Sequence, residues 1–139
     1  MPPQLTAELP TELLVLALGC VLLLAHILLA GRSRTQQYGK DWNMSARDGE
    51  MPPLDPVPAR LLRAQANYQE TFPAVAAVLL ALVVAGKTSD VTAIAAWTWL
   101  AARVVYLPLY WTGIPKVRTL VWSVGFAALL VLLGALLLG

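Results

Sequence analysis

The segment "RAQANYQETFP", residues 63–73, places three polar side chains directly before the apolar run "AVAAVLLALVVAG". Arg63, Asn67 and Glu70 follow one another at spacings of four and three, so a helix carries them on one face. Arg60 falls on the same face, one turn earlier. Guanidinium and amide groups on one stripe can bind an anionic, hydrogen-bonding ligand. The stripe therefore predicts a polar ligand site on this helix.

A second polar stripe follows later in the chain, where Arg103, Tyr106 and Tyr110 recur at helical spacing. A charge at the centre of an isolated spanning helix costs about 2.5–3.5 kcal/mol, so Arg103 and Glu70 require partners or water. One interpretation is that these two side chains pair and hold the helices together. The excess of arginines, which Arg118 increases further, instead favours a pocket for an anionic, hydrogen-bonding ligand.

Two prolines lie beside these stripes. Pro73 and Pro108 each remove a helix hydrogen bond and predict a kink. In a membrane such breaks are tolerated where neighbouring groups or cavity water satisfy the freed carbonyls. The kinks are compatible with a polar cavity and equally with ordinary helix packing.

The composition indicates a membrane protein. The chain has 139 residues, of which 58% are hydrophobic and 13% charged, and its mean hydropathy is +0.67. A soluble domain of this size cannot bury so much apolar surface, so the bilayer is the expected solvent. The net charge of +2 and the lack of a basic patch with interleaved aromatics indicate no nucleic-acid partner. Cys20 is expected to be a small buried side chain, and His26 a hydrogen-bonded one; no metal site is expected.

Hydropathy predicts an all-α membrane protein, with one domain over residues 1–139 that forms a bundle of four transmembrane helices. The apolar run Phe72–Gly86 has only about 15 residues, roughly 22 Å as a helix, against a hydrocarbon core of about 30 Å. Its helix must therefore begin earlier, which brings Asn67 and Glu70 to membrane depth. The predicted helices cover residues of about 12–31, 60–86, 90–111 and 117–138, with a polar loop at about 32–59.

Charges in the loops predict the orientation. The first and third loops carry most of the lysines and arginines, whereas Lys87 lies alone in the second loop. The positive-inside rule then places loops one and three in the cytoplasm and both termini outside it.

Small residues continue the polar stripe toward the other side of the membrane. Ala74, Ala77, Ala81 and Ala85 extend the stripe of Arg63 at spacings of three and four. Small residues at this spacing let two membrane helices approach closely. This side of the helix is therefore expected to face protein.

The segments "RLLRAQANYQETFP" and "RVVYLPLYWTGIPKVR" resemble the MAPEG family, the membrane-associated proteins of eicosanoid and glutathione metabolism, which include microsomal glutathione transferases. The resemblance covers nearly the whole chain. It implies a four-helix bundle that assembles as a homotrimer, with glutathione bound between subunits near the cytoplasmic face. The lead-in "RDGEMPPLDPVPARLLRA" is similar to bacterial members, which implies an integral, multi-pass protein of the bacterial inner membrane.

The resemblance also implies roles for single residues. Arg118 matches an arginine that stabilises the glutathione thiolate, and Thr71 stands where some transferases have tyrosine. Arg60, Arg103, Pro73 and Pro108 are expected to form the polar network around the site. The residues that match glutathione-binding positions are Arg32 or Arg34, Arg63, Gln65, Asn67, Glu70, Tyr106 and Tyr110.

Three functions fit these observations. The first is a glutathione transferase or peroxidase that acts on small lipophilic electrophiles or hydroperoxides. The second is a non-catalytic membrane protein that binds a lipid or another ligand on the same scaffold. The third, a small multidrug exporter, requires a membrane-embedded carboxylate in the first helix, where none is expected. Arginines near Glu70 would moreover keep its carboxylate ionised.

Overall fold

A computed structural model of the chain describes residues 8–139, and its secondary structure there is entirely helical. Four helices are long and apolar enough to cross a membrane, which confirms the predicted all-α, multi-pass fold and the bilayer environment. The fifth, α2, is a single short turn of helix near the end of the first span. The helices are α1 (Thr11–Tyr38), α2 (Lys40–Met44), α3 (Pro56–Val84), α4 (Asp90–Trp111) and α5 (Pro115–Leu138).

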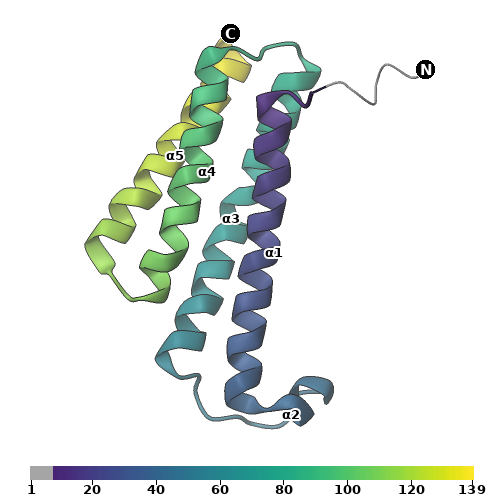
Figure 1. Cartoon of the computed structure of the whole chain (residues 1–139), viewed down its shortest axis with the longest axis vertical. Coiled ribbons are helices and arrows are strands. Elements are labelled where there is room, and N and C mark those ends of the chain that lie inside the picture. Colours follow the sequence, from purple (N-terminus) through teal and green to yellow (C-terminus); the bar gives the residue numbers. More distant parts are fainter. Residues whose placement is uncertain (1–7) are drawn as a thin grey trace, which may run out of the picture.

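The long helices form two antiparallel pairs, α1 with α3 and α4 with α5, and α4 also packs on α1 and α3 (Figure 1). The start of α1 and the end of α5 lie at the same end of the bundle. The opposite end carries α2, the loop that leads into α3, and the turn between α4 and α5. This second end is the basic one, because it holds both loops that are rich in lysine and arginine.

The helix boundaries differ from the predicted ones at the basic end. The first helix continues to Tyr38, seven residues past the predicted end, and α3 begins at Pro56 rather than at residue 60. Residues 32–38 contain no proline or glycine, so the helix continues into the polar region, where hydropathy no longer marks it. Both Pro56 and Pro115 stand at first helical positions, where the fixed φ of proline favours a helix start.

Apolar side chains form two core clusters, one above the other. The larger cluster is centred on Phe72, Val75 and Leu79 of α3, and the smaller one on Leu61 and Leu107 toward the basic end. The predicted polar stripe of α4 is buried in the bundle at Arg103 and Tyr106, which are each about 2% exposed, as is Trp99 one turn earlier. Since Arg103 lies between Leu100 of the first cluster and Leu107 of the second, a polar layer separates the two clusters.

The expectation that the first helix holds no buried carboxylate is wrong, because one is buried at its start, at the end opposite the basic loops. Glu12, in the first turn of α1, is 3% exposed and accepts a hydrogen bond of 2.7 Å from Thr92 Oγ1. Thr92 and Ser89 form the capping box of α4. The carboxylate therefore lies beside the first turns of both α1 and α4, where helix dipoles stabilise negative charge.

One expectation about side-chain environment is wrong, and a second concerns a surface that a single chain leaves uncovered. Cys20 is exposed on the outer surface of α1 rather than buried. Within a single chain, Ala74, Ala77 and Ala85 are also exposed, because α3 turns its valines and leucines toward the bundle instead. The alanine stripe is thus an outward face, and α3 packs against its own chain through the opposite side.

Candidate functional site

The basic end of the bundle holds a hollow of about 220 Å³ between the start of α3, the end of α4 and the start of α5. Of the residues from 8 to 139, none contributes an acidic side chain to it. We call it the cationic hollow; its lining residues are Arg60, Arg63, Tyr110, Gly113, Ile114, Pro115 and Arg118.

The arginines of the cationic hollow are held by aromatic and backbone groups. Arg63 Nε donates to the Tyr110 hydroxyl at 3.3 Å, and the Arg118 guanidinium lies over the Tyr110 ring at 4.5 Å. Arg60 Nη1 donates to the Trp111 carbonyl at 3.5 Å. These contacts orient three positive charges and neutralise none of them, so the hollow attracts anions.

Gly113 is required for this arrangement. Its φ is +77°, a conformation that L side chains rarely adopt, and a Cβ there would come within 2.9 Å of the Arg60 guanidinium carbon. The "TGIP" turn between α4 and α5 therefore lets Arg60 lie directly against the backbone. No local sequence signal marks this role, because it depends on the approach of a side chain from α3, 53 positions earlier in the chain.

Above the cationic hollow, Arg103 is enclosed in the bundle. Its Nη1 donates to Asn67 Oδ1 at 2.8 Å, while its guanidinium lies 5.1 Å from the ring centre of Tyr68 and 4.4 Å from that of Tyr106. The Tyr106 ring in turn meets Tyr110 edge to face at 5.6 Å. Contacts between aromatic rings and arginines thus connect Asn67, through Arg103, to the cationic hollow.

The alternative interpretation, a pairing of Arg103 with Glu70, is not what the structure shows. Glu70 is exposed on the outer face of α3, whereas Arg103 bonds to the amide of Asn67 inside the bundle. Three residues turn the helix by about 300°, so Glu70 points about 60° away from Asn67, and this rotation takes it from the half-buried edge of the stripe to its exposed side. Glu70 and the alanine stripe therefore share an outward face.

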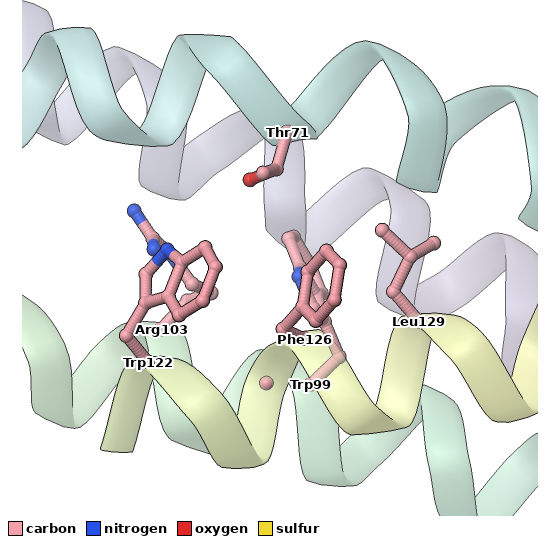
Figure 2. A pocket seen from close by; sticks show the side chains of 7 residues that line it. Thr71, Trp99, Arg103, Trp122, Phe126 and Leu129 are labelled. Atoms are coloured by element: carbon pink, nitrogen blue, oxygen red, sulfur yellow. The ribbon is translucent and has the colours of Figure 1, made fainter. Parts of the chain in front are cut away.

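A second, smaller hollow lies beside Arg103, between α3, α4 and α5 (Figure 2). Thr71 reaches down into it from α3, and Trp122 and Phe126 rise from α5 as a stacked pair with ring centres 5.1 Å apart. Its volume of about 10 Å³ is at the lower limit of the space that one water molecule needs. Arg103 Nε and Nη2 are buried without a hydrogen-bond partner among residues 8–139. This hollow has room for no acceptor larger than one water molecule.

His26 differs from the expectation that it would be hydrogen-bonded. It is 1% exposed, and neither ring nitrogen has a partner in the described part of the chain. Its ring packs at 4.9 Å from that of Tyr68, whose hydroxyl donates to the Gly19 carbonyl at 2.5 Å. The histidine therefore packs as an aromatic ring. Tyr68, which sequence reasoning passed over, is the residue around which His26, Phe72 and Arg103 gather.

The remaining predicted site residues lie on a different side of the chain. Arg32 is exposed on α1, where it lines a groove with Ile27, Lys40 and other residues of α1 and α2. Arg34 instead lies 5.5 Å from the Trp42 ring, which joins α2 to α1. Gln65 is about 200° round α3 from Asn67. One chain thus brings Arg63, Asn67, Tyr106, Tyr110 and Arg118 together, and keeps Arg32, Arg34 and Gln65 apart from them.

Pro73 and Pro108 both lie inside continuous helices, on exposed positions. Neither lines the cationic hollow. Within residues 8–139, no three histidine, cysteine, aspartate or glutamate side chains gather where they could hold a metal ion.

The fold and the geometry define a class: a four-span membrane protein with an acid-free cluster of arginines and tyrosines at its basic end. The MAPEG family model matches residues 12–138, and the chain belongs to this family. It is therefore a membrane protein of the glutathione and eicosanoid metabolism group. No curated protein and no solved structure matches the chain.

Proposed function

We propose that the protein is a homotrimeric, glutathione-dependent membrane enzyme that acts on lipophilic electrophiles or hydroperoxides. The observation that carries the proposal is the cationic hollow, in which three arginines face a shared space without an acidic partner. Glutathione carries two carboxylates, an ammonium group and a thiol. Arginines can clamp carboxylates bidentately, and a carboxylate such as Glu70 can bind the ammonium.

The dimensions of α3 suit this ligand. Arg63 and Glu70 are seven residues apart, which is about 10 Å along a helix. An extended tripeptide spans about the same length. A glutathione molecule that runs along α3 can therefore place one end at Arg63 and the cationic hollow, its middle at Asn67, and its amino group at Glu70.

The proposal requires a second subunit. The face of α3 that carries Glu70 is outward in the single chain, and a carboxylate exposed to lipid at membrane depth is costly. Arg32 and Gln65 lie on other faces of the same chain. A neighbouring subunit that covers this face of α3 would bury Glu70, and it could supply its own Arg32 and Gln65 to complete the binding site.

The proposed chemistry uses the sulfur of glutathione. A free thiol has a pKa of about 8.5, and a nearby guanidinium favours the thiolate. Arg118, whose guanidinium lines the cationic hollow, is the proposed thiolate-stabilising residue. In conjugation the thiolate attacks an electrophilic carbon, a C–S bond forms, the leaving group departs with its electron pair, and the thiol proton passes to water. In peroxide reduction two glutathiones become a disulfide while the hydroperoxide becomes alcohol and water.

A glutathione titration of the purified trimer tests the proposal. We expect saturable binding by calorimetry and a rise in the ultraviolet absorbance of the thiolate that free glutathione lacks at the same pH. The absorbance should fall when the pH is lowered, because protonation removes the thiolate. Absence of glutathione binding would exclude the proposed function.

A non-catalytic binding protein is the second candidate. The cationic hollow contains no acid–base side chain other than Tyr110, and Thr71 replaces a tyrosine that some transferases have. Saturable binding without the thiolate signal, and without turnover of electrophiles or hydroperoxides, would assign the protein to this class.

We further propose that the basic end of the bundle faces the cytoplasm of a bacterial cell, across the inner membrane. Reporter fusions at Gly139 and within the loop at residues 45–55 should report opposite sides, with the loop cytoplasmic. The reason is the concentration of lysine and arginine at the end that carries this loop. Two cytoplasmic signals, or a cytoplasmic Gly139, would refute this orientation.

A further inference from the structure

The amide of Asn67 can be oriented in only one way. Its Oδ1 accepts a hydrogen bond from Arg103 Nη1 at 2.8 Å. A guanidinium has donors and no acceptor, so the oxygen of the amide must face it. The amide nitrogen then points away from Arg103, and it has no hydrogen-bond partner among residues 8–139.

Arg103 is itself held rigidly. The rings of Tyr68 and Tyr106 pack against its guanidinium, and the side chain is 2% exposed. Tyr68 is anchored in turn by its hydrogen bond to the Gly19 carbonyl, and a Cβ at Gly19 would come within 2.9 Å of Phe72. Rotation of the guanidinium would therefore require the aromatic core to repack.

We infer that Arg103 is a positioning residue, which makes Asn67 a pure hydrogen-bond donor toward the ligand. The inference rests on the proposed glutathione site and adds a specificity to it. On the stripe of α3, Arg63 would bind a carboxylate of the ligand and Glu70 its ammonium group. Asn67 would donate a hydrogen bond to an acceptor atom between them. For a bound tripeptide, the group opposite Asn67 is then a carbonyl or carboxylate oxygen rather than an N–H.

Asn67→Asp separates stability from binding. The introduced carboxylate meets a buried guanidinium that has no acidic partner among residues 8–139, so we expect the thermal midpoint of the protein in detergent to rise by about 3 °C or more. The same change removes both N–H donors and repels an anionic ligand, so the Kd for glutathione should rise at least about 10-fold. Calorimetry and thermal unfolding measure the two effects on one preparation.

Three further variants test whether Arg103 causes the predicted effects of Asn67→Asp on the thermal midpoint and on glutathione binding. In an Arg103→Met background, Asn67→Asp should lower the midpoint, because the carboxylate is left without a cation. Arg103→Lys, which keeps the charge and a donor, should bind glutathione more tightly than Arg103→Met does. Gln69→Glu, an equal charge change at an exposed position two residues along α3, should not raise the midpoint.

A residue with only a structural role would move stability and binding in the same direction. The inference is therefore overturned if Asn67→Asp lowers the midpoint in the wild-type background, or if it leaves the Kd within about twofold. If wild type binds no glutathione, the proposed function fails, yet the midpoints of the single and double variants still decide whether Arg103 orients the amide.

Discussion

Arg118→Ala should reduce the rate of glutathione conjugation about 100-fold and leave the Kd for glutathione within about threefold. Loss of one group that stabilises a developing or resting anion typically costs a factor of about 10²–10³ in kcat. A factor of 100 corresponds to about 2.7 kcal/mol of activation free energy. The protonated thiol makes little use of this guanidinium, so ground-state binding is largely retained.

The position of Arg118 explains why its effect should fall on the thiolate. Its guanidinium lies 4.5 Å from the ring centre of Tyr110 and lines the cationic hollow beside the first turn of α5. A helix N-terminus adds positive potential at the same place. Without Arg118, the pKa of the bound thiol should rise by about 1–3 units, so the thiolate absorbance should appear only at correspondingly higher pH.

Two comparison variants make the prediction specific. Arg63→Ala should weaken glutathione binding about 10–100-fold and change turnover at saturation much less, because a carboxylate clamp acts equally in ground and transition states. Lys116 is exposed two residues before Arg118 and does not line the hollow. Lys116→Ala should therefore change neither the Kd for glutathione nor the turnover. If Arg118→Ala retains wild-type turnover and thiolate absorbance, Arg118 does not stabilise the thiolate.

Much of the fold could be predicted from the sequence, because membrane spans depend on local composition. Hydropathy located all four long helices, and helical spacing correctly placed Arg103 and Tyr106 on one face of α4, which is buried. The first span proved longer than predicted because hydropathy marks where a helix leaves the hydrocarbon core. It does not mark where the hydrogen-bonded helix ends, which here is Tyr38.

Periodicity could not predict which neighbour each face would meet. Asn67 and Glu70 share a stripe in the sequence, yet one bonds to Arg103 inside the bundle and the other is exposed. The difference depends on how far α3 is rotated about its own axis, which is determined by the packing of Tyr68, Phe72 and Val75. Likewise, the need for Gly113 depends on Arg60, a residue distant in sequence, and no local signal reports it.

Ala77→Leu should dissociate the proposed trimer and abolish glutathione binding with it. Ala77 is exposed at the centre of the alanine stripe, on the face of α3 that also carries Glu70. Small residues allow close approach of helices in a membrane, and a larger side chain at a packed contact typically costs about 1–3 kcal/mol. In a symmetric trimer the substitution occurs in all three interfaces, so the cost applies three times to the assembled state.

The loss of binding follows from the division of the site. Arg63 and Asn67 lie on one side of the chain, and Arg32 and Gln65 lie on others, so a separated subunit offers glutathione only part of its contacts. Native mass spectrometry should show trimers for wild type and monomers for Ala77→Leu, with glutathione retained by the trimers alone. Ala101→Leu is the matched control, since Ala101 is exposed on α4 among the large apolar side chains of Trp97, Val104 and Val105, as expected of a surface that faces lipid. A stable wild-type monomer that binds glutathione would show that one chain suffices, and the costly exposure of Glu70 would then require a partner other than a second subunit.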